Sequence, residues 1–134
     1  MSYLKNLLAD TEYQQKKSAL GLDSPELTTL HREIILKKKF LRKTYTDWYR
    51  QILVQISDVS EGKILEIGSG GGFLKMIRPD IITSDILPLP HCDFVISAEK
   101  IPFADEELSA IVMIDAFHHL PDCEKFLNEA SRTL

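Results

Sequence analysis

The chain has 134 residues and a net charge of −4, with 44% hydrophobic and 27% charged residues. This length and composition are those of one globular domain with a core large enough to fold. No apolar run approaches the length of a membrane span, and the first residues do not begin a signal peptide. The two cysteines, Cys92 and Cys123, make no metal or disulfide framework. We therefore expect a cytoplasmic protein with reduced thiols, no membrane span and no metal site.

Residues 1–60 are predicted to form a helical cap or lid region. Leucines at helical spacing indicate one or two helices over residues 2–20, with Gly21 as a C-terminal stop. Ser24 is a predicted N-cap, and Pro25 is the first residue of the helix that follows it.

An apolar stripe follows a bend that is expected near residues 37–40. We interpret the stripe as packed core that covers the first strand or forms part of a lid, rather than as a cofactor-binding surface. Its members recur at helical spacing: Leu41, Tyr45, Trp48, Ile52 and Ile56.

A basic cluster occupies residues 37–43, within a region (residues 1–60) that carries ten Lys and Arg against seven Asp and Glu. Such a cluster fits either a solvated helix face or a contact with an anionic substrate or nucleic acid. No aromatic residues are regularly interleaved with it, which disfavours nucleic acid as a partner.

Residues 61–134 change period and are predicted to form an α/β domain. Apolar runs of strand length alternate there with helical segments, as in a parallel sheet. Seven residues separate Asp85 from Asp93, and two of them are prolines, so a loop is expected instead of a crossover helix. The expected strands are residues 63–67, 81–84, 94–97 and 110–114, and the expected helices are residues 71–77 and 121–133.

A glycine cluster directly follows the first expected strand, and a strand, a glycine-rich turn and a helix in this order form a nucleotide-binding crevice. A P-loop is excluded because no Gly-Lys-Ser/Thr closes the turn. The dinucleotide fingerprint begins with Gly68 and Gly70, but its third glycine position is Phe73, whose ring opposes close helix–strand packing. An NAD-dependent oxidoreductase is therefore disfavoured.

The same turn resembles motif I of the class I S-adenosylmethionine-dependent methyltransferases, an acidic-x-G-x-G-x-G pattern whose positions are filled by Glu66, Gly68, Gly70 and Gly72. Later segments resemble this family in the same order. They are residues 83–85 at the end of the second strand, residues 98–103 (AEKIPF), residues 111–114 with 117–120 (FHHL), and residues 129–134. All five segments together are similar to the methyltransferase type 11 group.

The resemblance implies an α/β fold with a Rossmann-like parallel sheet, its first four strands in the order 3-2-1-4, and an N-terminal helical region. It implies S-adenosyl-L-methionine as cofactor and residues 61–134 as a partial binding domain. The family's sheet has seven strands, so we expect a chain truncated after the fourth strand and of little activity alone. That strand would be an unpaired edge, which predicts a possible homodimer through it.

The resemblance also implies roles for individual residues. Glu66 helps to hold the methionine ammonium, or is a solvated strand-end carboxylate. Asp85 accepts the ribose hydroxyls, or is a turn residue. Ser97 stands where an aspartate is common, and it can still accept a weaker hydrogen bond. The implied cofactor-binding set is Glu66, Gly68, Ser69, Gly70, Gly72, Asp85, Ile86, Ser97, Ala98 and Glu99.

Three residues after the fourth strand are candidate catalytic groups: Asp115, His118 and His119. Asp115 could orient a nucleophile or cap a turn. The histidines could serve as general bases, or the second could make a structural hydrogen bond. Methyl transfer can rely largely on positioning, so a base is not required. The methyl acceptor stays unknown, and the alternative function is a non-catalytic S-adenosylmethionine-binding or protein-interaction module.

Overall fold

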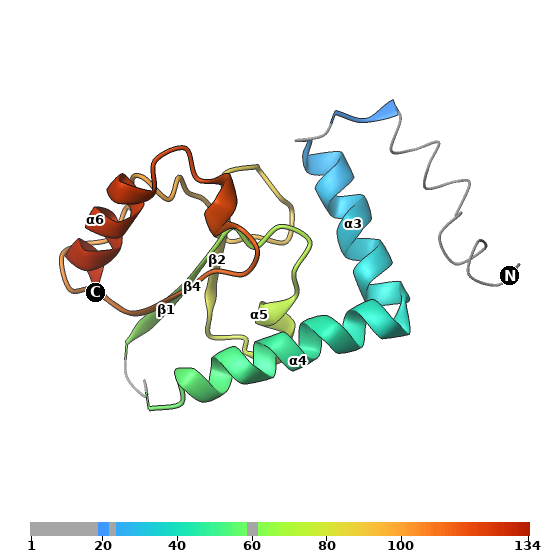
Figure 1. Cartoon of the computed structure of the whole chain (residues 1–134), viewed down its shortest axis with the longest axis horizontal. Coiled ribbons are helices and arrows are strands. Elements are labelled where there is room, and N and C mark those ends of the chain that lie inside the picture. The colour runs from blue at the N-terminus through green and yellow to red at the C-terminus, as the bar shows by residue number, and fades with distance from the viewer. Residues whose placement is uncertain (1–18, 22–23, 59–61) are drawn as a thin grey trace, which may run out of the picture.

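The computed structural model describes residues 19–21, 24–58 and 62–134. Within them, helices flank one parallel sheet (Figure 1). The elements are α3 (Pro25–Lys37), α4 (Lys39–Gln55), β1 (Lys63–Ile67), α5 (Leu74–Ile77), β2 (Ile82–Asp85), β3 (Phe94–Val95), β4 (Leu108–Val112), the 3-10 turn η1 (Phe117–His119) and α6 (Cys123–Thr133). The helices predicted over residues 2–20 lie almost wholly outside the described residues. No helix in the described part is long and apolar enough to cross a membrane.

The sheet has four strands in the order β3-β2-β1-β4, and every pairing is parallel. This confirms the predicted α/β, Rossmann-like fold and the 3-2-1-4 order. The connection from β2 to β3 contains no helix, as its length and prolines predicted. β4 lies at one edge of the described sheet. The homodimer through that edge stays a prediction.

Several predicted boundaries are wrong by a few residues. The third strand ends at Val95 because the chain turns back there, with Ser97 bridging Lys100 in antiparallel fashion. The fourth strand is Leu108–Val112 rather than residues 110–114, and the second ends at Asp85. The first helix of the domain begins at Leu74 rather than at residue 71, because the glycine turn occupies the residues before it.

Two apolar clusters cover the two faces of the sheet. On one face, Tyr49 of α4 packs with Ile64 of β1 and Leu74 of α5. On the other, Phe126 of α6 packs with Leu65 of β1. Side chains alternate across a strand, so the near-continuous apolar run of β1 serves both layers. One cluster therefore joins the N-terminal helices to the sheet, while the predicted domain boundary at residue 60 stays a prediction.

The helix pair α3–α4 begins and bends as the sequence predicted. The Ser24 side chain accepts a hydrogen bond from the Leu27 amide at 3.1 Å, and Pro25 is the first helical residue. Lys38 has an extended backbone and separates α3 from α4, which confirms the expected bend. Among the residues of the basic cluster, Lys43 pairs with Asp47 on the surface of α4.

Tyr49, not Trp48, is the buried aromatic residue of α4, which corrects the predicted stripe. Trp48 is 43% exposed and Tyr49 is 1% exposed. The Tyr49 hydroxyl accepts a hydrogen bond from the buried Phe73 amide at 2.9 Å, and its ring meets the Phe73 ring edge-on at 5.0 Å. Positions three and four residues along a helix both lie on one face, so spacing alone did not distinguish the two aromatics.

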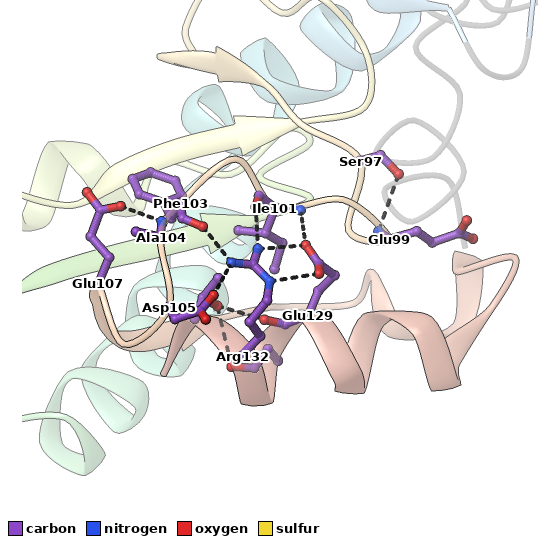
Figure 2. Close-up of polar contacts among 11 residues, drawn as sticks. Ser97, Glu99, Ile101, Phe103, Ala104, Asp105, Glu107, Glu129 and Arg132 are labelled. Carbon is purple, nitrogen blue, oxygen red and sulfur yellow. Dashed lines mark hydrogen bonds and ion pairs between the residues drawn. The ribbon is translucent and has the colours of Figure 1, made fainter.

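An ion-pair network fastens the loop after β3 to α6 (Figure 2). The Arg132 guanidinium pairs with Glu129 at 2.9 Å and donates to the carbonyls of Ile101 and Phe103 at 2.9 and 2.8 Å. Glu129 also accepts from the Ile101 amide at 2.8 Å. The hydrogen bonds from Arg132 and the Ile101 amide lower the pKa of Glu129 to about 2. The loop that carries Ser97 to Glu99 is thus anchored immediately beyond them.

Replacing Tyr49 with Phe should destabilise the protein by about 1–3 kcal/mol, because the Phe73 amide loses its acceptor while staying buried. The measurement is urea unfolding followed by circular dichroism. Trp48→Phe is the control on the neighbouring exposed ring, and it should change the free energy of unfolding by less than about 0.5 kcal/mol. Equal effects of the two substitutions would contradict the assigned hydrogen bond.

The ionisation of Glu129 should make the stability of the protein depend on pH in the acid range. Its pKa is about 2 in the folded chain and ordinarily 4.5, so its contribution is complete above pH 4.5 and is lost as the pH falls toward 2. The urea midpoint of the wild type should therefore exceed that of Glu129→Gln at pH 6, and the difference should shrink by pH 3. Glu124→Gln, on the same helix, serves as control. A difference that is constant with pH would contradict the role of the ionised carboxylate.

Candidate functional site

A cleft of about 580 Å³ opens at the carboxyl ends of the strands, where α/β sheets bind ligands. Its lining combines the glycine turn, the ends of β2 and β3, and the segment after β4. All ten residues of the predicted cofactor-binding set line it: Glu66, Gly68, Ser69, Gly70, Gly72, Asp85, Ile86, Ser97, Ala98 and Glu99. Of the candidate catalytic residues, Asp115 and His119 line the cleft, whereas His118 is not among its lining residues.

The glycine turn requires glycine at two positions for steric reasons. Gly68 has φ of +69°, and a Cβ there would lie 2.5 Å from the Cβ of Ala116. A Cβ on Gly72 would lie 2.4 Å from the Tyr49 hydroxyl oxygen. Contacts below 3 Å exclude a side chain, so the turn fits only as a bare backbone between α4 and the segment after β4.

Glu66 is buried at the end of β1, 3% exposed, and accepts a hydrogen bond from the Ser69 hydroxyl at 2.7 Å. Burial raises the pKa of Glu66, while the Ser69 hydrogen bond and the charge of Arg32 oppose the rise. A buried carboxylate with a single short hydrogen bond retains lone pairs for a further donor. The solvated reading of Glu66 is thus wrong, since the side chain is withdrawn from solvent.

Asp85 ties the end of β2 to the glycine turn. Its carboxylate oxygens accept from the Gly70 amide at 2.8 Å and from the Leu87 amide at 2.9 Å. The Gly70 carbonyl in turn accepts from His91 Nε2 at 2.7 Å, and burial lowers the pKa of that imidazole. Asp85 therefore has the turn role that the sequence left open. Each of its oxygens still has a lone pair beyond the one used.

Ser97, Ala98 and Glu99 form the side of the cleft next to β3, with Ile86 exposed near them. The Ser97 hydroxyl accepts from the Glu99 amide at 3.3 Å (Figure 2). The Oε1 atom of Glu99 is buried and has no hydrogen-bond partner among the residues that the structure describes. Native structures rarely leave such an oxygen unpaired, and a ligand donor in the cleft would satisfy it.

The segment after β4 places Asp115 and His119 at the opposite side of the cleft. Asp115 has φ of +52°, a left-handed backbone that non-glycine residues seldom adopt outside turns and functional sites. Its carboxylate lies 3.7 Å from His118 Nδ1, and the two histidine rings lie 3.9 Å apart. Both histidines belong to η1, but only His119 lines the cleft.

The sequence predicted a cap or lid over residues 1–60 but did not identify the residues through which it lines the cleft. Thr28 and His31 of α3 and Tyr45 and Tyr49 of α4 also line the cleft. Their i, i+3 and i, i+4 spacings place each pair on one helix face, which a spacing search could have found. The docking of α3 onto the turn, where a Cβ on Gly71 would lie 3.1 Å from a backbone nitrogen of α3, has no local sequence signal.

Comparison with known proteins gives one match. A family model described as a methyltransferase domain matches residues 65–134, which is more than half of the chain. The match begins within β1 and contains the whole of β2, β3 and β4. Neither the curated proteins nor the solved structures contain a match to the chain.

Two glycine substitutions should separate backbone strain from steric exclusion. Gly70 has φ of +49°, but a Cβ there would meet only the Gly68 carbonyl oxygen at 3.9 Å. Gly70→Ala should therefore cost about 1–2 kcal/mol from the left-handed backbone alone. Gly68→Ala carries the same kind of strain and adds the contact with Ala116, so its urea midpoint should fall further. A smaller fall in the urea midpoint for Gly68→Ala than for Gly70→Ala would show that the segment after β4 moves to accommodate the added methyl group.

Proposed function

Because the chain belongs to the class I S-adenosylmethionine-dependent methyltransferase family, we propose that it binds S-adenosylmethionine in this cleft and serves methyl transfer to an acceptor. The family as a whole uses this cofactor. One observation carries the proposal: ten residues from the glycine turn, from the end of β2 and from the loop after β3 meet in one cleft.

The hydrogen-bonding groups of the cleft suit this cofactor. It supplies a methyl group on a cationic sulfonium and also carries an ammonium, a ribose diol and an adenine. Buried Glu66 offers lone pairs to an ammonium, and the bare backbone of the turn admits the amino-acid head closely. The unpaired oxygen of Glu99 would accept a donor on the adenine side. Carboxylate, backbone and hydroxyl groups are thus present where a cationic nucleoside needs them.

Asp85 has two tasks in this proposal. It would accept the ribose hydroxyls with its remaining lone pairs, and it already fixes Gly70 and Leu87. Holding the turn before the ligand arrives lowers the entropy lost on binding. Residues 1–60 would act as a cap through α3 and α4, whose side chains form one wall of the cleft.

Positioning rather than proton transfer is the main catalytic contribution in this proposal. Asp115 and His119 would orient the acceptor, and His119 could take a proton released from it. His118 lies outside the lining and would act at most by holding Asp115, from which it is separated by 3.7 Å.

Calorimetric titration with S-adenosylmethionine, S-adenosylhomocysteine and NAD tests the proposal. We expect saturable binding of the first two ligands and none of NAD, because Phe73 fills the third glycine position of the dinucleotide fingerprint. Binding of NAD with no binding of S-adenosylhomocysteine would overturn the proposal. Cofactor binding with no turnover on any acceptor would favour a non-catalytic binding module.

Matched variants locate the ligand within the cleft. Asp85→Ala should weaken the binding of S-adenosylhomocysteine by at least about tenfold, since each hydrogen bond to a charged acceptor contributes on the order of 1.5 kcal/mol or more. His119→Ala should weaken it less, and His118→Ala, outside the lining, should leave it unchanged. Circular dichroism establishes that each variant is folded. An inverted order would place the ligand at the other side of the cleft.

A further inference from the structure

The cleft has two sides with different strands behind them. The sheet order β3-β2-β1-β4 places β4 across β1 from β2 and β3. Residues proposed to hold ribose and adenine follow β2 and β3, whereas Asp115 follows β4. His31 of α3 and Tyr45 of α4 also line the cleft. The part beside Asp115 and Tyr45 is therefore free of the roles proposed for the cofactor.

Asp115 is fixed in position by its neighbours. Ala116 packs so closely on Gly68 that a Cβ on the glycine would lie 2.5 Å from the alanine Cβ. The left-handed backbone of Asp115, with φ of +52°, turns the chain at this contact. The carboxylate itself is 78% exposed and its nearest ionic contact is His118, at 3.7 Å. Asp115 thus presents an accessible negative charge beside the glycine turn.

Tyr45 offers a second polar group in the same cleft. Its ring is held by Trp48, Tyr49 and Phe73, with centroids 5.1, 6.0 and 6.2 Å away. Burial and the negative charge of Asp115 raise the pKa of Tyr45, so the hydroxyl stays protonated and lies within electrostatic range of that carboxylate. No hydrogen bond of this hydroxyl occurs within the described ranges, so it remains available to a ligand.

The charge of the lining is one-sided. It includes four carboxylates, Glu66, Asp85, Glu99 and Asp115, and none of the described lining residues is Lys or Arg. Arg32 influences Glu66 electrostatically but is not among the lining residues. An acceptor carrying a carboxylate or phosphate at its reactive end would meet repulsion here without a compensating cation.

We propose that the part of the cleft between Tyr45 and Asp115 is the acceptor subsite and that it takes an amine. This rests on the proposed methyltransferase function. The Asp115 carboxylate attracts the acceptor as an ammonium ion, and the Tyr45 hydroxyl accepts one of its N–H groups. The aromatic rings behind Tyr45 hold that hydroxyl in place.

The chemical step balances with these residues. The bound ammonium first gives one proton to an imidazole nitrogen of His119, which passes it to water. The freed nitrogen lone pair then forms a bond to the methyl carbon as the carbon–sulfur bond breaks. The electron pair of that bond stays on sulfur, and S-adenosylhomocysteine leaves as a neutral thioether. The product is the N-methylated ammonium.

Sinefungin tests the subsite without requiring turnover. In this cofactor analogue a carbon bearing an ammonium replaces the methylated sulfur, whereas S-adenosylhomocysteine has a neutral sulfur there. Calorimetry on the whole chain should show sinefungin bound about fivefold more tightly than S-adenosylhomocysteine, as expected for a largely exposed ion pair. The preference should fall to less than about twofold in Asp115→Asn. Asparagine tolerates the left-handed backbone as well as aspartate does, so this variant should fold.

The outcomes separate this proposal from the one it rests on. If the wild type binds neither ligand, the proposed methyltransferase function fails. If it binds S-adenosylhomocysteine but shows no preference for sinefungin, or if Asp115→Asn keeps the preference, the amine subsite is wrong and cofactor binding stands. Tyr45→Phe should also reduce the preference. Asp80→Asn removes an exposed carboxylate before the start of β2, outside the lining, and should retain it.

Discussion

The cleft depends on one close approach, in which a glycine turn fits between two helices and the segment after β4. Neither Gly68 nor Gly72 has room for a Cβ, because Ala116 and the Tyr49 hydroxyl already occupy that space. The Tyr49 hydroxyl also accepts a hydrogen bond from the Phe73 amide. The group that excludes a side chain at Gly72 therefore also satisfies a buried donor. A backbone held this way exposes its polar groups to a ligand without first having to reorganise.

Buried negative charge is the second constraint. Glu66 and Asp85 are both buried and interact unfavourably, and the charge of Asp85 contributes to the raised pKa of Glu66. Ser69 and backbone amides offset part of this cost. Carboxylates that are buried without an ion-pair partner among the described residues lower the stability of the fold and favour a cationic ligand. A cofactor carrying an ammonium and a sulfonium matches that arrangement.

The sequence was sufficient for the sheet and for the side of the cleft built on it. Glu66, the glycines and Asp85 could be found because their segments resemble motifs of a known family, and because the carboxyl ends of parallel strands meet at one edge of the sheet. The sequence was insufficient where packing between distant segments decides which side chains are buried. Trp48 and Tyr49 are equally compatible with the helical period, and only the Phe73 amide distinguishes them. The contact of α3 with the glycine turn depends on the bend at Lys38. The spacing of apolar residues along the sequence does not determine the angle of that bend.

The two sides of the cleft are held by different kinds of interaction, and this has a consequence for specificity. Beside β3, the loop that carries Ser97 to Glu99 is anchored by directional bonds of Arg132 and Glu129, which fix a backbone. Beside β4, Tyr45 is held by packing against aromatic rings and the apolar cluster under α4, and its hydroxyl makes no hydrogen bond to the described residues. Packed side chains can be exchanged for others of similar volume at modest cost. Removing Arg132 or Glu129 would instead leave backbone groups of the loop without their hydrogen-bond partners. Under the proposed function, the helical wall could change the acceptor that it admits while the side built on the sheet keeps the same cofactor.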